Sequence, residues 1–179
     1  MKYLLNNEES ARLRFRKVSH DQFDQWLPFF QDPDSFRYWD GPRNEPVDEC
    51  KAWIEKQLWR YENDMGGMNA LIEKETGLLA GYCGLLVQTV EDKTELEIGY
   101  SLLPRFRKLG FATEAATKCR DFAFEHELAD SLISIISITN LPSQHVAIKL
   151  GMKKDFVSSY HENEVYIYRI TANSLKQRS

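Results

Sequence analysis

Residues 97–115 read Glu97-Ile-Gly-Tyr-Ser-Leu-Leu-Pro-Arg-Phe-Arg-Lys-Leu-Gly-Phe-Ala-Thr-Glu-Ala115, and their pattern changes from strand to helix within this segment. The first half alternates apolar and polar residues, which is typical of a strand, and Pro104 ends it. The second half begins at Gly110 and continues as a helix with apolar residues on one face. Between the halves lies a loop with three cations in four positions, Arg105, Arg107 and Lys108.

A strand, a loop of small and cationic residues and a helix N-terminus together predict an anion-binding site. The first backbone N–H groups of a helix have no partner within it, and the helix dipole adds partial positive charge there. Gly110 permits close approach of a phosphate, and Thr113 can add a hydroxyl donor. The alternative is a basic surface loop before an ordinary helix. The loop matches neither the Walker pattern nor Gly-x-Gly-x-x-Gly.

The segments on both sides of residues 97–115 predict a mixed sheet with helices on its faces, an α/β fold. Strands are expected over 12–18, 68–73, 78–90, 95–103, 131–139, 152–159 and 165–170. Helices are expected over 23–30, 46–65, 111–126 and 142–150. Residues 131–139 are almost all apolar and β-branched, which indicates a strand buried on both faces. Residues 1–10 and 174–179 are expected to be frayed.

Length and composition exclude several classes of protein. A chain of 179 residues, 42% of them hydrophobic, predicts one domain spanning residues 1–179, with its core at about 12–171. No apolar run is long enough for a membrane span or a signal peptide, so we expect a cytoplasmic protein without membrane contact. A net charge of −4 gives no reason to expect nucleic-acid binding. Three distant cysteines and four scattered histidines predict reduced core thiols and no metal site.

Two motifs carry a resemblance to a known family. Arg107-x-x-Gly110-x-Ala112 resembles the Arg/Gln-x-x-Gly-x-Gly/Ala signature of the GNAT superfamily of acetyl-CoA-dependent N-acetyltransferases. The flanking residues, and the later run Asn140-x-x-Ser143-x-x-x-x-x-Lys149-Leu-Gly151-Met152, resemble the branch of ribosomal-protein N-terminal acetyltransferases called RimJ/RimL-like. The resemblance covers about residues 13–170. It departs at Lys108-Leu109, where relatives often carry Gly-Lys, and at Met152, where Phe is commoner.

The resemblance implies a fold and a mode of CoA binding. The fold would be α/β (α+β), with a mostly antiparallel sheet of six to seven strands, splayed in the middle, and about four helices on its faces. The loop and the first helical turn would hold the CoA pyrophosphate, the preceding strand would pair with pantetheine, and an asparagine would bond the pantetheine arm. The residues at these positions are Arg107, Lys108, Leu109, Gly110, Phe111, Ala112 and Thr113; Tyr100, Ser101 and Leu102; and Asn140.

Acetyl transfer to an amine needs a base, because a free alkyl amine is protonated near neutral pH. Glu97 is the catalytic candidate, with Glu95 on the same strand face as its rival and a merely solvated carboxylate as the alternative. Many GNAT enzymes have a tyrosine as acid at the position of Ala147. Ser143 stands where the RimJ/RimL-like branch has its serine, and it either contacts the thioester sulfur or caps the following helix.

The acceptor is the part that the resemblance specifies least. Tyr38 and Trp39 lie in a loop that borders the acceptor cleft in this family; they either contact the acceptor or anchor the loop. The expected reaction is direct acetyl transfer from acetyl-CoA to a primary amine in a ternary complex, with a protein N-terminal α-amine suggested by the branch. The alternatives are a small-molecule amine (polyamine, amino acid or antibiotic) and a non-catalytic acyl-CoA sensor. The protein is expected to be a monomer or a homodimer.

Overall fold

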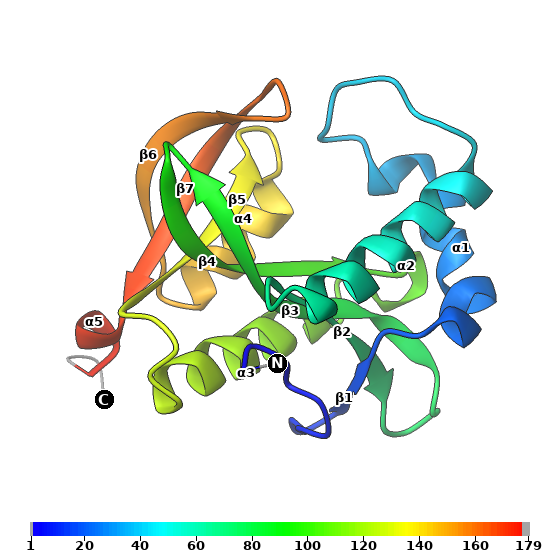
Figure 1. Ribbon diagram of the computed structural model, residues 1–179, viewed down its shortest axis with the longest axis horizontal. Helices are drawn as coiled ribbons and strands as arrows, with labels where there is room; N and C mark the ends of the chain where they lie inside the picture. The colour runs from blue at the N-terminus through cyan, green and yellow to red at the C-terminus, as the bar shows by residue number, and fades with distance from the viewer. Residues whose placement is uncertain (1, 177–179) are drawn as a thin grey trace.

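The computed structural model describes residues 2–176 and contains a seven-stranded sheet in the order β1-β2-β3-β4-β5-β7-β6 (Figure 1). The strands are β1 (Leu13–Lys17), β2 (Gly66–Glu73), β3 (Leu79–Val90), β4 (Lys93–Leu102), β5 (Ser131–Ser137), β6 (Lys153–Tyr160) and β7 (Asn163–Thr171). The helices are α1 (Phe23–Gln31), α2 (Pro46–Glu62), α3 (Phe111–Glu125), α4 (Leu141–Lys149) and α5 (Ala172–Lys176). Only β4 and β5 pair in parallel, so the mixed, mostly antiparallel sheet is confirmed.

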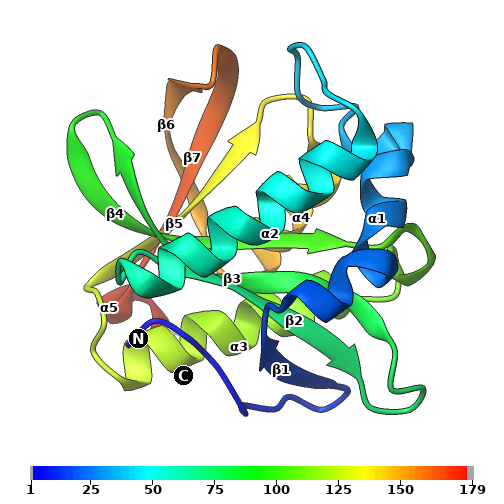
Figure 2. The same ribbon diagram turned by 45° about the vertical axis from the view of Figure 1, so that its right-hand side comes forward.

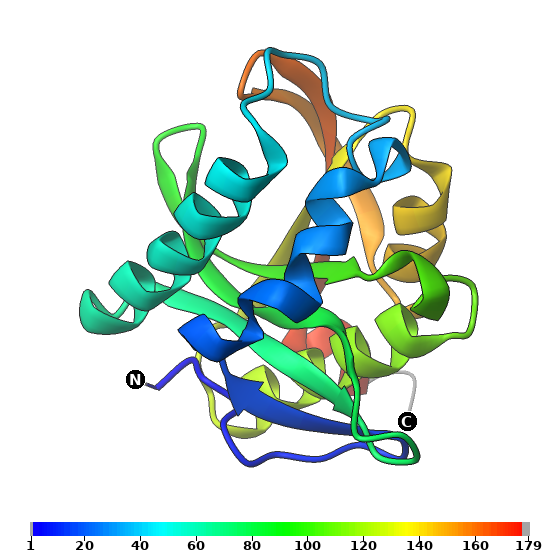
Figure 3. The ribbon, with the colours of Figure 1, turned by 90° about the vertical axis from the view of Figure 1, so that its right-hand side faces the viewer.

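The side chains of β3 show which helices cover each face of the sheet. Tyr82 is fully buried against Trp26 of α1 and Trp53 of α2. The next residue, Cys83, points to the other face, where its sulfur lies 3.5 Å from that of Cys119 in α3. Successive strand residues face opposite sides, so α1 and α2 cover one face and α3 covers the other. Figure 3 shows α1 (blue) and α2 (cyan) together in front of the sheet.

Strands β4 and β5 diverge, and this divergence opens the middle of the sheet. Their register has a single aligned pair, Glu97 with Ile133, whereas β3 and β4 stay paired from Gly81–Leu102 to Val90–Lys93. Figure 2 shows β5 (yellow) turning away from β4 after they meet. The splayed sheet is therefore present, and residues 98–102 of β4 have no aligned partner in β5.

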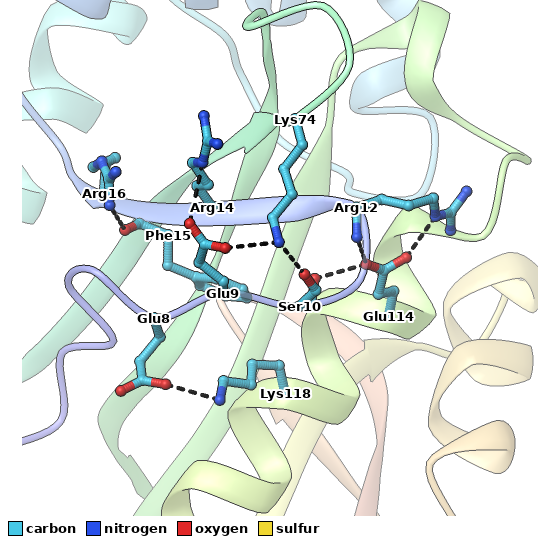
Figure 4. Close-up of polar contacts among 10 residues, drawn as sticks. All are labelled: Glu8, Glu9, Ser10, Arg12, Arg14, Phe15, Arg16, Lys74, Glu114 and Lys118. Atoms are coloured by element: carbon cyan, nitrogen blue, oxygen red, sulfur yellow. Dashed lines mark hydrogen bonds and ion pairs between the residues drawn. The ribbon is translucent and has the colours of Figure 1, made fainter.

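The N-terminal segment corrects an expectation from the sequence, because residues 2–10 are not a frayed tail. Leu5 is fully buried, and Glu8 and Ser10 form backbone hydrogen bonds with β1. Figure 4 shows the ion pairs that fix the segment, among them Glu8 with Lys118 of α3 at 2.8 Å. A buried leucine and these bonds order a stretch that was expected to be frayed as a chain end. At the other end, residues 174–176 belong to α5, and 177–179 lie outside the described residues.

The described residues bear on three further expectations, which concern the cysteines, a membrane span and a metal site. Cys50, Cys83 and Cys119 are buried and free. Within residues 2–176, no helix is long and apolar enough to cross a membrane. Over the same range, no group of three or more His, Cys, Asp or Glu side chains is placed to hold a metal ion.

Candidate active site

The loop between β4 and α3 presents backbone donors to solvent. Gly110 is the N-cap residue of α3 at φ +86°, and Lys108 also has a left-handed backbone, with φ +63°. Across the described part of the chain, the N–H groups of residues 108–113 have no hydrogen-bond acceptor. Free N–H groups at a helix N-terminus form an anion site. We call residues 107–113 the anion-binding loop.

Arg12 of the N-terminal segment holds this loop in shape. Its Nη1 donates to the Leu109 carbonyl at 3.0 Å, and its Nε pairs with Glu114 at 2.6 Å. Its guanidinium also lies 4.2 Å from the ring centroid of Phe111. The C=O and N–H of a trans peptide point in opposite directions, so holding the Leu109 carbonyl turns the Gly110 N–H to the other side. Figure 4 shows the Arg12–Glu114 pair. Nothing in the sequence near the loop pointed to Arg12.

The Arg107 side chain is bound to protein groups. Its guanidinium donates to Asp32 at 2.6 Å, to the Ser35 hydroxyl at 2.6 Å and to the Leu102 carbonyl at 3.2 Å. Partial burial alone would raise the pKa of Asp32, but the bonds from Arg107 and from nearby groups bring it below its ordinary value. Arg107 therefore ties the anion-binding loop to the segment after α1, a contact between residues 75 positions apart.

The open edge of β4 carries Tyr100, Ser101 and Leu102, which the sequence assigned to pantetheine. These residues lie beyond the single β4–β5 pair, so their backbone faces the gap on the β5 side. The Tyr100 hydroxyl crosses to α4 and donates to the Ser143 carbonyl at 2.9 Å. Burial raises the pKa of Tyr100, which keeps the phenol protonated.

The start of α4 separates two roles that the sequence left open for Ser143. Asn140, not Ser143, is the N-cap: its Oδ1 accepts the Ser143 N–H at 3.1 Å. Ser143 lies in the first turn, half-buried, and among the described residues its hydroxyl has no hydrogen-bond partner. Ala147 is fully buried one turn later. The Asn140 side-chain oxygen is thus engaged, and the Ser143 hydroxyl is available to a ligand.

Glu97 lies at the point where β4 and β5 part. Its Oε2 accepts from Gln88 Nε2 of β3 at 2.6 Å. Burial raises the pKa of Glu97; the bonds from Gln88 and the Ile135 N–H, and the charges of Arg60 and Lys56, oppose that rise. The carboxyl is therefore a stronger base than an exposed glutamate.

Glu95, the rival on the same strand face, is in a different environment. Arg169 of β7 binds both of its carboxylate oxygens, at 2.8 and 2.9 Å. Arg169 also pairs with Asp155, and these carboxylates raise its pKa. Both oxygens of the Glu95 carboxylate are thus engaged by one cation, which leaves neither of them free to bond a substrate amine. The geometry therefore favours Glu97 over Glu95 as a base.

The loop that carries Tyr38 and Trp39 is attached to the β6–β7 turn. The Trp39 ring lies 6.3 Å from that of Tyr160, and the Asp40 N–H donates to Asn163 Oδ1 at 2.7 Å. Trp39 packs on the smaller apolar cluster around Ile133 and Val165. Trp39 therefore has an anchoring role in this structure, while Tyr38 remains half-exposed.

The structure also brings side chains to the site that the sequence did not single out. Arg60 of α2 and Gln88 of β3 lie beside Glu97, and Arg12 and Asp32 hold the anion-binding loop. Arg12, Asp32 and Arg60 are far from residues 97–115 in the sequence, whereas Gln88 lies nine residues before Glu97, in the neighbouring strand β3. Their local patterns give no signal of this role.

Comparison with known proteins adds an independent finding. Residues 12–153 match the family model described as an acetyltransferase (GNAT) domain. The uncharacterised protein YkkB of Bacillus subtilis (strain 168) is 32% identical over 145 residues, which cover 79% of this chain and 81% of YkkB.

Solved structures agree. An acetyltransferase from Agrobacterium tumefaciens str. C58 has a TM-score of 0.77 and 25% identity, covering 92% of this chain and 94% of that one. RimL, a ribosomal L7/L12 alpha-N-protein acetyltransferase solved with coenzyme A, shares the fold at a TM-score of 0.74 and 12% identity, covering 94% and 98% of the two chains. Since the family model spans more than half of the chain, we conclude that this protein belongs to the GNAT acetyltransferase family and is an acetyl-CoA-dependent acyltransferase.

Proposed function

We propose that the protein moves the acetyl group of acetyl-CoA directly to a primary amine, with Glu97 as the general base. One observation carries the proposal: a half-buried carboxyl of raised pKa lies where β4 and β5 part, next to the open edge of β4. An ammonium group cannot attack a thioester until it loses a proton. A carboxyl with a pKa nearer neutrality accepts that proton more readily.

Coenzyme A would be held mainly by backbone groups. The unpartnered N–H groups of Lys108, Leu109, Gly110, Phe111, Ala112 and Thr113 suit the pyrophosphate, with the Thr113 hydroxyl beside them. Tyr100, Ser101 and Leu102 would pair with pantetheine along the open edge of β4, and Asn140 would offer its amide N–H₂. Arg107 would act by fixing the loop.

In the reaction, the amine nitrogen attacks the thioester carbonyl carbon and forms the C–N bond. The C–S bond then breaks, and CoA leaves as a thiolate. The proton lost from nitrogen goes to Glu97, directly or through a water molecule. The Ser143 hydroxyl, free of protein partners within the described residues, is placed to donate a hydrogen bond to the sulfur. A backbone N–H near Ser101 or Leu102 would stabilise the oxyanion.

For the acceptor, we propose a protein N-terminal α-amine, as in the RimJ/RimL-like branch. The motifs of that branch and the shared fold with RimL support this choice. An α-amine has a pKa of about 8, against about 10 for a lysine side chain. A larger neutral fraction at pH 7 therefore makes it an easier nucleophile for a carboxyl base. Tyr38 and Trp39 would border the acceptor.

The test compares Glu97→Gln with Glu95→Gln. Loss of the base should lower kcat about 10²- to 10⁴-fold, while calorimetric CoA affinity stays as in the wild type. Glu95→Gln should retain turnover. Because Glu97 must be deprotonated to act and burial raises its pKa, wild-type kcat should fall with decreasing pH at a midpoint above about 4.3, the ordinary glutamate value.

The acceptor is tested with peptides that start with Ser, Ala or Met, alongside polyamines, amino acids and aminoglycosides. Free-thiol release with peptides alone supports the α-amine. Turnover confined to small amines contradicts the proposed acceptor, and CoA binding without any turnover favours a sensor. Full activity of Glu97→Gln would remove Glu97 from the mechanism.

A further inference from the structure

Arg60 is a charged residue that the fold buries almost completely. Its exposed fraction is 6%, although it lies on α2, whose other face is solvated. Its Nη1 donates to the carbonyls of Met65 and Val87 at 3.0 and 3.2 Å. Its Nη2 donates to Gln88 Oε1 at 3.2 Å. Burying a cation costs free energy. Packing alone therefore does not explain why an arginine occupies this position.

Gln88 connects this buried cation to Glu97. Its Oε1 accepts from Arg60, and its Nε2 donates to the Glu97 carboxylate at 2.6 Å. A guanidinium is only a donor and an ionised carboxylate is only an acceptor. The amide of Gln88 can therefore satisfy both neighbours in one orientation alone. The arginine fixes the amide, and the amide fixes the carboxylate.

We propose that Gln88 is a positioning residue for Glu97, and that Arg60 locks Gln88 in the orientation that presents an N–H to the Glu97 carboxylate. This inference rests on the proposed role of Glu97 as the base. A base must be held within a fraction of an ångström of its working geometry to be effective. A glutamate side chain has several rotamers, and the bond from Gln88 selects one of them.

Other charged and titratable groups also face Glu97, and they set the background for any change at Gln88. Lys56 and Arg60 reach it from α2, Tyr160 from β6 and Tyr100 from β4 itself. The Tyr160 hydroxyl lies 3.5 Å from Gln88 Nε2. Glu97 is therefore surrounded by two cations and two phenols, and Gln88 makes its closest side-chain contact.

The first variant is Gln88→Met, which keeps the length of the side chain and removes its hydrogen bonds with Arg60 and Glu97. Without its donor the charged form of Glu97 is less favoured, so the acid limb of the kcat–pH profile should move to higher pH. We also expect kcat on the plateau, at pH values above this limb, to fall by about 10-fold or more. Gln88→Glu, which places a second carboxyl there, should move the limb further in the same direction. Arg60→Met should reproduce the direction of Gln88→Met.

The matched control for Gln88→Met is Gln57→Met. Gln57 is a buried glutamine on α2, the helix that also carries Arg60. Its Oε1 accepts the Met68 N–H at 2.9 Å, and within residues 2–176 its side chain forms no hydrogen bond with Glu97. This variant should lose stability, as Gln88→Met does, but leave the acid limb unmoved. A purely structural role of Gln88 would give both variants the same kinetic behaviour.

A second readout does not depend on knowing the acceptor. The Glu97 carboxyl is titrated by ¹³C NMR on glutamate-labelled protein, with its resonance assigned by its loss in Glu97→Gln. A higher titration midpoint in Gln88→Met supports the proposal, whereas an unchanged midpoint overturns it. If the midpoint moves but Glu97→Gln retains full turnover, the proposed role of Glu97 as the base fails and the contact between Gln88 and Glu97 stands. If Glu97→Gln loses turnover while Gln88→Met keeps the wild-type profile and midpoint, this inference alone fails.

Discussion

The anion-binding loop and the surroundings of Glu97 are built in opposite ways, although one strand, β4, leads to both. The loop is a continuous, largely exposed segment whose binding groups are backbone N–H groups. Glu97, Gln88 and Arg60 come from three elements, are mostly buried, and act through side chains. A backbone site tolerates most side chains but depends on φ and ψ. A side-chain site tolerates little change in residue type but depends on the packing of distant elements.

The two regions also differ in how they are held. Arg12 and Arg107 support the loop from outside, through its carbonyls and through Asp32. The Glu97 carboxylate is held inside the protein by the Gln88 amide and the Ile135 N–H. The comparison predicts that changes in the loop affect CoA binding, whereas changes around Glu97 affect turnover.

Among changes in the anion-binding loop, Gly110→Val is expected to have the largest effect on CoA affinity. Valine is strongly disfavoured at φ +86°, so the start of α3 should rearrange and its N–H groups should lose their common direction. Two lost hydrogen bonds to a phosphate correspond to a loss of about 100-fold or more in CoA affinity, which calorimetric titration measures. Gly77→Val is the control, since Gly77 also has a left-handed φ of +72° but lies in open space in a hairpin turn. Unchanged CoA affinity in a folded Gly110→Val protein would refute the backbone site.

A smaller effect is expected from Arg107→Met and Asp32→Asn. If Arg107 acts by fixing the loop, both variants should weaken CoA binding about equally, by about tenfold for one charge-assisted bond, and the double variant should add little. The salt dependence of CoA affinity should stay as in the wild type. A direct contact with phosphate predicts otherwise: Arg107→Met would lose part of the salt dependence, and Asp32→Asn would bind CoA more tightly.

Arg12→Met should have a more modest effect, because Arg12 orients one peptide of the loop and is itself half-exposed. We expect CoA to bind about three- to tenfold more weakly, about the value of one hydrogen bond. Arg14→Met is the matched control, since Arg14 lies two residues further along the chain, in β1, and contacts Glu9 instead of the loop. Equal CoA affinities in the two variants would show that Arg12 has no part in shaping the loop.

The smallest effect concerns Lys108→Gly. Lys108 has φ +63°, which costs free energy for any residue with a Cβ. Glycine should raise the free energy of unfolding by about 0.5–1 kcal/mol, or Tm by about 1–4 °C. Thermal unfolding of the protein without ligand measures this change. A lower Tm would mean that the lysine side chain stabilises the loop by more than its backbone strain costs.

Local sequence patterns were enough to predict the individual strands and helices. Alternation in residues 95–103 predicted a strand with one apolar face, and Leu96 and Ile98 of that face are buried. Gly110 and the cations before it predicted the start of a helix with open N–H groups. Patterns failed where stability comes from a distant partner. Residues 2–10 looked like a polar tail, and they are ordered because Leu5 is buried and Glu8 meets Lys118 of α3.

The sequence also left the choice between Glu95 and Glu97 open, because both lie on one face of the same strand. The fold gives the two carboxylates different partners, Arg169 for Glu95 and Gln88 for Glu97. Arg169 belongs to β7, far from β4 in the sequence. Gln88 lies in the neighbouring strand β3, where the register places it opposite Glu95, and its side chain nevertheless bonds to Glu97.

The sequence by itself therefore determined the strands, the helices, the mixed sheet and the loop that presents backbone donors, because these depend on φ, ψ and the spacing of apolar residues over short distances. Only the tertiary structure decided which partners Glu95 and Glu97 meet, and that Arg107 faces Asp32. Those features depend on burial and on the partners that each side chain meets. Both are set by contacts between residues far apart in the chain.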